Sequence, residues 1–88
     1  MRVSFNRAFL KELSDIPSTT RIKIEELVFK TVPNYSSINE IPSLKKLKGY
    51  RNYYRIRVGD YRIGVKIDNE IINFERVLHR KEIYKRFP

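Results

Sequence analysis

The spacing of the apolar residues changes once along this chain, and that change constrains the fold more than any other feature. In the first third, apolar residues recur at helical intervals, over residues 9–16 and again over residues 24–32. From Tyr53 onward they alternate with polar residues, as they do in half-buried β-strands. Pro17 interrupts the helical stretch. The sequence therefore predicts a hairpin of two helices followed by an antiparallel sheet.

Short turns divide the second half of the chain into three strands. Gly59 and Asp60 form a two-residue connection with glycine first, which favours a type II′ turn between strands at residues 53–58 and 61–67. Residues 68–70 turn the chain again, into a last strand. We expect these strands to form a β-meander with one apolar face.

The remaining elements carry weaker signals. Residues 2–5 alternate as a short strand does, and residues 80–87 suit a short helix or an ordered tail. In the last strand Arg76 breaks the alternation, which predicts a β-bulge near Glu75. Ser18 is the expected N-cap of the second helix.

These elements add up to one α+β domain over residues 1–88, with two layers. Pro33 ends the second helix, and residues 33–43 read as a loop by composition. The expected order is β-α-α-β-β-β with a short C-terminal helix. The N-terminal helical hairpin packs on the apolar face of a mostly antiparallel sheet.

The composition excludes several kinds of site and favours a polyanionic partner. The chain has no cysteine and one histidine, which excludes thiolate chemistry and a histidine metal site, and we expect no cofactor. The net charge is +9, of which residues 45–88 contribute +8. Such a surface fits nucleic acid, or else an acidic protein, an anionic lipid or solubility alone. Without a membrane-length apolar run or a signal peptide, we expect a cytoplasmic protein with no membrane partner.

The predicted register places like charges opposite each other. With a two-residue turn, Arg57 pairs with Arg62 and Arg55 pairs with Gly64, all on the face away from the core. Directly opposed like charges destabilise a sheet, so the pair indicates an anion that arginine forks bind bidentately. Gly64 is expected to leave an open floor beside Arg55. The alternative is a set of exposed arginines whose stems cover apolar surface.

Three residues after the last strand add chemistry at the same end of the sheet. His79 is a natural proton donor at neutral pH, and Arg80 follows it. Tyr84, one helical turn beyond Arg80, suits stacking on a base or a hydrogen bond to a phosphate. Taken alone, each signal is weak: a histidine that ends a strand is more often structural than catalytic, and simple packing is the alternative for Tyr84. With no glycine-rich phosphate loop, carboxylate pair or Ser/His/Asp set, metal-free phosphoryl chemistry or plain binding remains.

Two runs of sequence resemble the signatures of the RelE/ParE toxin superfamily. One is LKGYRNYYRIRVGDYR over residues 47–62, and the other is RVLHRKEIY over residues 76–84. Together with the order of the elements, the resemblance covers essentially the whole chain. It implies the toxin of a bacterial or archaeal type II toxin–antitoxin pair. The implied partner is a cognate antitoxin, bound in a hetero-oligomer.

The resemblance also implies a reaction and the residues that perform it. Toxins of the RelE branch enter the ribosomal A site and cut mRNA without a metal, through attack of a 2′-hydroxyl on the adjacent phosphate. The implied catalytic residues are Arg55, Arg57, Arg62, His79, Arg80 and Tyr84. His79 would act as the general acid. The implied RNA-binding residues are Lys45, Lys46, Lys48, Arg51, Tyr53, Lys81, Lys85 and Arg86.

The general base is the open point of this mechanism. The best-known relative has lysines where this chain has Arg55 and Arg57, and arginine is too basic for that role. Glu40, in the loop before the first signature, is a weak candidate.

Two other functions stay open. The ParE branch of the superfamily inhibits DNA gyrase and performs no nuclease chemistry, but it usually lacks part of the basic and tyrosine set that this chain keeps. The other alternative is an inactive homologue that only binds its antitoxin.

Overall fold

The computed structural model describes residues 1–88, and its strands pair into a single mixed sheet with the order β1-β5-β4-β3-β2. The strands are β1 (Arg2–Phe5), β2 (Leu44–Lys46), β3 (Tyr53–Val58), β4 (Tyr61–Asp68) and β5 (Ile71–His79). β1 runs parallel to β5, and the other pairings are antiparallel. The expected α+β fold with a mostly antiparallel sheet is confirmed.

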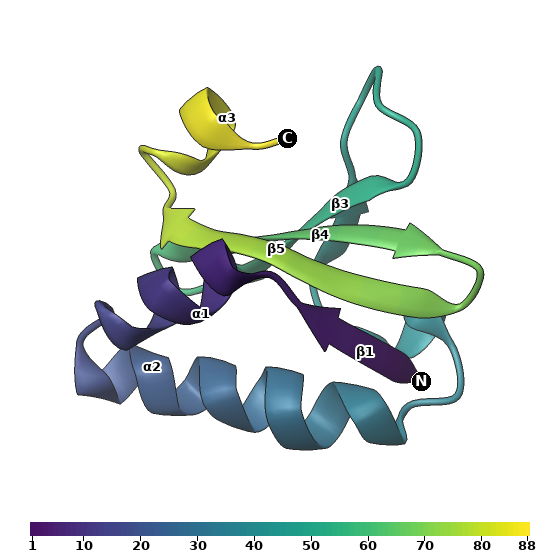
Figure 1. The fold of residues 1–88 in the computed structure, drawn as a ribbon, viewed down its shortest axis with the longest axis horizontal. Helices are drawn as coiled ribbons and strands as arrows, with labels where there is room; N and C mark the ends of the chain where they lie inside the picture. The colour runs from purple at the N-terminus through teal and green to yellow at the C-terminus, as the bar shows by residue number, and fades with distance from the viewer.

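The two N-terminal helices cover one face of the sheet, as expected (Figure 1). They are α1 (Arg7–Ser14) and α2 (Ser18–Glu25), and α2 continues as one rod through the π-helical η1 (Glu26–Thr31) and the 3₁₀ turn η2 (Val32–Asn34). The expectation that Ser18 is the N-cap is wrong. Pro17 holds that position, and its carbonyl accepts the N–H groups of Thr20 and Arg21. Its fixed φ suits the entry to a helix, so no side-chain cap is needed.

The core lies between this helical layer and the sheet. Phe9 and Leu13 of α1 and Ile24 of α2 meet strand residues that include Ile63 and Phe74, all of them buried. Burying each such side chain stabilises the fold by about 1.5–3 kcal/mol. No polar or charged residue is fully buried. The apolar pattern of the sequence therefore identified the core side of each element correctly.

The turns and the register of the meander also match the sequence. Gly59 has a φ of +57° and Asp60 does not have a positive φ, which confirms the type II′ turn. Arg57 pairs with Arg62, as expected. In β5 the register jumps by one residue opposite the step from Gly64 to Val65, which leaves Glu75 as the extra residue of a β-bulge. The predicted bulge is confirmed.

Two elements beside the sheet complete the fold. Strand β2 was not expected, because three residues are too few to show an alternation; it becomes a strand by pairing with residues 54–56 of β3. The short helix α3 (Ile83–Arg86) lies on the face opposite α1 and α2 (Figure 1). A further 3₁₀ turn, η3 (Ile38–Glu40), precedes β2. Of the helices, none has the length and apolar character that a membrane-spanning segment needs.

Candidate functional site

The face of the sheet away from α1 and α2 is strongly basic. Paired residues of adjacent strands point to the same face, so each row of partners across the sheet can be read from the register. One row contains Arg57 and Arg62, and the next contains Lys45, Arg55 and Gly64. Strand β2 thus adds a lysine that the expected sheet lacked. We refer to the basic face as Lys45, Arg55, Arg57, Arg62, Lys66 and Arg76.

The turn between β3 and β4 gathers two of the predicted phosphate ligands. Nη1 of Arg62 donates to the carbonyl oxygens of Gly59 and Tyr61, at 2.9 and 3.0 Å. The N–H of Arg80 donates to the carbonyl of Asp60 at 2.7 Å, and Nε of Arg80 lies 3.7 Å from the Asp60 carboxylate. Arg62 and Arg80 thus each contact the turn through their side chains, and Arg57 pairs with Arg62 across the two strands.

The position expected to be an open floor is filled. The ring of Phe87 lies on Gly64, where a Cβ atom would approach three ring carbons to 2.7 Å. Phe87 is only 5% exposed, and its ring also meets the ring of Tyr53. The expectation of an open floor is wrong, because the missing side chain of Gly64 makes room for the C-terminal segment. Nη1 of the neighbouring Arg55 donates to the carbonyl of Ser43.

An ion pair between Glu12 and Arg76 connects the C-terminal segment to the helical layer. The sequence did not reveal this pair. Glu12 of α1 accepts the Nε–H of Arg76, shared between its two carboxylate oxygens at 3.0 Å each, and one hydrogen bond from Nη2 at 2.5 Å. The same carboxylate accepts the N–H of Val77 at 3.1 Å. Nη1 of Arg76 donates to the carbonyl of Arg86, at the end of α3. Hydrogen bonding to Glu12 raises the pKa of Arg76 above its ordinary value, against a smaller opposing effect of burial.

The location of this pair follows from where β1 ends. The pairing of β1 with β5 stops at Phe74, so the edge of β5 beyond it has no strand partner. Helix α1 lies along that edge, and the Glu12 carboxylate bonds the main chain there. The break in alternation at Arg76 was the available sequence signal, but its partner lies 64 residues away.

His79 does not join the arginines on the basic face. It pairs with Tyr61, on the face of the sheet that carries the core, and its ring meets the Tyr61 ring edge-on at 5.6 Å. Its Nδ1 accepts the N–H of Lys81. Leu78, and not His79, is the partner of Arg62 across β4 and β5. The register thus places His79 on the opposite face of the sheet from Arg57 and Arg62.

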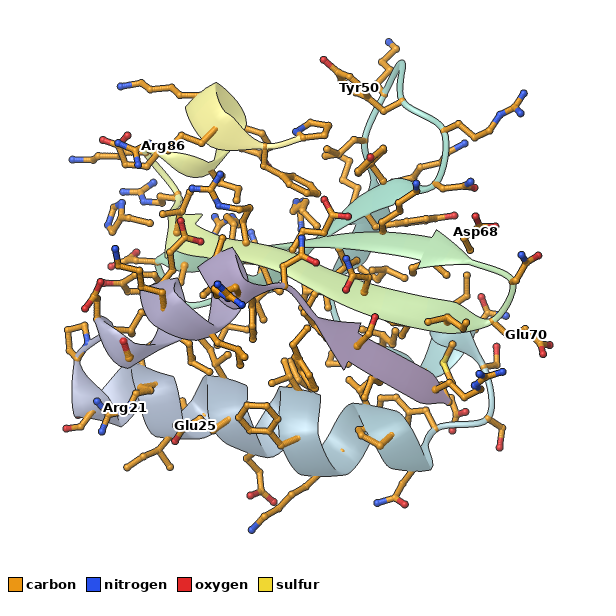
Figure 2. All side chains as sticks on the ribbon, viewed as in Figure 1. Arg21, Glu25, Tyr50, Asp68, Glu70 and Arg86 are labelled. Atoms are coloured by element: carbon orange, nitrogen blue, oxygen red, sulfur yellow. The ribbon has the colours of Figure 1, made fainter.

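The other predicted residues are spread around the basic face. Tyr84 stands on α3 with 59% of its surface exposed. Lys46 pairs with Tyr54 and so points to the opposite face from Lys45. Figure 2 shows Arg86 and Tyr50 on the same side of the sheet, away from α2. Lys48 and Arg51 lie in the exposed loop between β2 and β3, and Lys81 and Lys85 lie at α3.

Glu40, the candidate base, has a local structural role. Its carboxylate accepts the N–H groups of Ser36 and Ser37, which closes a capping box at η3. Nothing in the structure brings it to Arg57 or Arg62.

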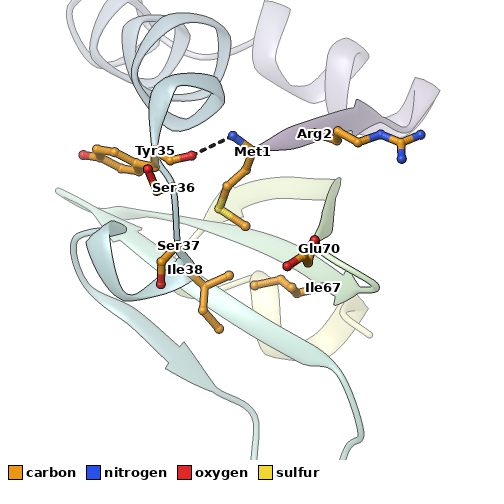
Figure 3. A pocket seen from close by; sticks show the side chains of 8 residues that line it. All are labelled: Met1, Arg2, Tyr35, Ser36, Ser37, Ile38, Ile67 and Glu70. Atoms are coloured by element: carbon orange, nitrogen blue, oxygen red, sulfur yellow. Dashed lines mark hydrogen bonds between the residues drawn. The ribbon is translucent and has the colours of Figure 1, made fainter.

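One cavity lies away from the basic face. It measures about 520 Å³ and is lined by residues that include Met1, Tyr35, Ile38, Ile67 and Glu70 (Figure 3). Ile67 and Glu70 are at the end of β4 opposite to the arginine turn. No three His, Asp or Glu side chains come together in a group that could hold a metal ion.

Comparison with known proteins identifies the family. A family model described as the ParE toxin of the type II toxin–antitoxin system parDE matches residues 3–84. Toxin RelE3 of Methanocaldococcus jannaschii is 47% identical over 89 residues, covering 100% of both chains. The chain belongs to the RelE/ParE family of type II toxins. Putative toxin RelE1 of the same organism is 31% identical over 94% of this chain and 93% of that one.

Solved structures of this toxin family share the fold. The RelB–RelE antitoxin–toxin complex from Methanococcus jannaschii matches with a TM-score of 0.82 and 46% identity, over 97% of this chain and 99% of that chain. A RelE–RelB complex from Pyrococcus horikoshii, at 24% identity and a TM-score of 0.70, covers 93% of this chain and 97% of that chain. The family predicted from residues 47–62 and 76–84 is thereby confirmed.

Proposed function

We propose that this toxin is an mRNA endoribonuclease that acts in the ribosomal A site and so blocks translation. The observation that carries the proposal is the gathering of Arg57, Arg62 and Arg80 around one turn, where directly opposed like charges favour a bound phosphate. Ribosomes would place its action in the cytoplasm.

In the proposed reaction the 2′-oxygen of a nucleotide attacks the adjacent phosphorus, and the bond from phosphorus to the 5′-oxygen breaks. The 2′-hydroxyl loses a proton, the leaving 5′-oxygen gains one, and a 2′,3′-cyclic phosphate remains. Arg57, Arg62 and Arg80 would stabilise the negative charge that builds up on the phosphate oxygens. Tyr84 would stack on a neighbouring base. We leave His79 and Glu40 outside the proposed catalytic set because of where they lie.

A RelB-like antitoxin is the proposed protein partner. The solved relatives from Methanococcus jannaschii and Pyrococcus horikoshii are complexes of RelE with RelB. An acidic or amphipathic antitoxin segment lying across the basic face would neutralise it and exclude RNA. Part of the affinity would then weaken as ionic strength rises.

Inhibition of DNA gyrase is the second candidate, because the matching family model is described as a ParE toxin. The basic residues and Tyr84 favour the nuclease, since a gyrase inhibitor has no need of several arginines around one phosphate. The two functions have different substrates, so one pair of assays separates them.

The test compares toeprinting of a translated message with supercoiling by purified gyrase. We expect new mRNA ends in the ribosomal A site with the wild-type toxin and none with Arg62→Ala. Arg21→Ala, on the helical layer, is the matched control and should cleave as wild type does. Unchanged toeprints together with blocked supercoiling would establish the gyrase function instead.

A further inference from the structure

Three aromatic side chains, two from neighbouring positions and one from the C-terminal segment, form a continuous row at the edge of the basic face. The rings of Tyr50 and Tyr53 have centroids 6.4 Å apart at an angle of 80°, and those of Tyr53 and Phe87 are 5.7 Å apart at 72°. Nζ of Lys66 lies 5.6 Å from the centre of the Tyr53 ring. We call Tyr50, Tyr53 and Phe87 the aromatic row.

The three side chains of the aromatic row differ in how much of their surface is exposed to a ligand. Phe87 is buried and Tyr53 is half-buried among its neighbours, whereas 53% of the surface of Tyr50 is exposed. Tyr50 lies near the tip of the loop that rises from the sheet between β2 and β3, on the same side as α3 (Figure 2). The two less exposed rings of the row thus support the exposed ring of Tyr50.

The loop that carries Tyr50 is fixed at its base. The N–H of Leu47 donates to the carbonyl of Tyr53, and the N–H of Ile67 donates to the carbonyl of Asn52, both at 2.8 Å. Gly49 and Asn52 have positive φ angles, of +84° and +68°, which the loop needs in order to turn back on itself. The base of the loop therefore places the Tyr50 ring at a defined position.

The charged residues of the loop that carries Tyr50 are of one sign. Lys48 and Arg51 flank it in the loop, both exposed, and residues 44–59 contain no carboxylate. An exposed aromatic ring among cations is the arrangement that binds single-stranded nucleic acid, with the cations on the phosphates and the ring on a base. Tyr53 and Arg57 are four residues apart on β3, about 13 Å at the rise of a strand.

We propose that Tyr50 is a nucleobase-stacking residue, which binds a base of the RNA strand some distance from the phosphate held by Arg57 and Arg62. This inference rests on the proposed function, because it takes RNA as the ligand. It adds a second contact to the RNA, one that recognises the face of a base. Stacking on every base is favourable, so the contact would set affinity and position more than sequence.

The absence of tryptophan from the chain allows a direct test in Tyr50→Trp, whose fluorescence reports on position 50 alone. The ligand is a six-nucleotide 2′-O-methyl RNA, which cannot be cleaved, and its comparison is an abasic oligonucleotide with the same number of phosphates. We expect the RNA to quench the fluorescence and the abasic strand to leave it unchanged. Equal quenching by the two strands would overturn the proposal. Phe29→Trp, on the helical layer, is the control and should respond to neither strand.

Binding measurements on two further variants separate stacking from size and charge. We expect Tyr50→Phe to bind a fluorescein-labelled copy of the RNA as wild type does, and Tyr50→Leu to bind it about 5- to 150-fold more weakly. Equal affinities of these two variants would also overturn the proposal. Neither measurement involves cleavage. Loss of stacking with intact toeprints refutes the inference alone, and stacking without toeprints refutes only the proposed nuclease.

Discussion

The ion pair between Glu12 and Arg76 gives the sharpest prediction about stability. The Glu12 carboxylate accepts hydrogen bonds from Nε and Nη2 of Arg76 and from the N–H of Val77. The pair joins α1 to β5 and, through Arg76, to the end of α3. We consider two changes. Glu12→Gln keeps the size of the side chain and an oxygen that can accept the Val77 N–H. Glu12→Leu removes the carboxylate, so Arg76 and the Val77 N–H both lose this hydrogen-bond acceptor.

The magnitudes follow from burial and from the bonds lost. The side chains of Arg76 and Glu12 are 25% and 17% exposed, which places the pair between surface pairs, at about 0.2–1 kcal/mol, and buried pairs, at about 3–5 kcal/mol. Because Glu12→Gln loses the charge and one of the two acceptor oxygens, we expect it to lower the free energy of unfolding by about 1–2 kcal/mol. Glu12→Leu also leaves Val77 N–H without a partner, so we expect about 3 kcal/mol.

Urea unfolding followed by circular dichroism measures both values, and a surface pair supplies the control. Arg21 and Glu25 on α2, labelled in Figure 2, approach only to 3.9 Å, with side chains 35% and 41% exposed. Glu25→Gln should therefore cost no more than about 0.5 kcal/mol. If Glu12→Gln destabilised the protein no more than Glu25→Gln does, the argument for a structural clamp at Arg76 would be refuted.

Four further outcomes are expected. The raised pKa of Arg76 keeps it charged until the pH rises through that pKa, so the effect of Glu12→Gln should be the same at pH 7 and about pH 10 in the same urea titrations. Gly64→Ala should displace the Phe87 ring, destabilise the protein by about 1–3 kcal/mol and speed hydrogen exchange in α3; in a Phe87→Ala background its cost should largely vanish. Arg62→Ala should abolish growth arrest, and growth arrest at normal protein levels would contradict the proposed role of Arg62. The same change should alter the free energy of unfolding by less than about 1 kcal/mol, because relief of the repulsion from Arg57 offsets the lost hydrogen bonds to Gly59 and Tyr61. His79→Ala should slow single-turnover cleavage by less than about tenfold; a loss of about 10²–10⁴-fold, restored by a substrate with a 5′-sulfur leaving group, would instead establish His79 as the general acid.

Local patterns in the sequence were sufficient for the elements, the turns and the register. Helical spacing over residues 9–32 and alternation from Tyr53 identified the layers, because each period leaves one apolar face to bury. The glycine of Gly59-Asp60 determined the turn, and a two-residue turn leaves only one pairing for Arg57. The bulge at Glu75 was visible because one extra residue shifts the alternation of the strand.

Only the tertiary structure decided which distant segments contact each other, because no pattern in the sequence links those segments. The short strand β2 exists through its pairing with β3, and Phe87 covers Gly64 because the chain returns over the sheet after α3. Residues that pair across β4 and β5 share a face of the sheet, so His79, the partner of Tyr61, lies on the face opposite Arg62. The β-bulge shifts the alternation by one residue, which makes the face of His79 hard to predict from the sequence. Glu12 and Arg76 lie 64 residues apart, and they meet because β1 ends at Phe5 and leaves an edge of β5 for α1 to cover.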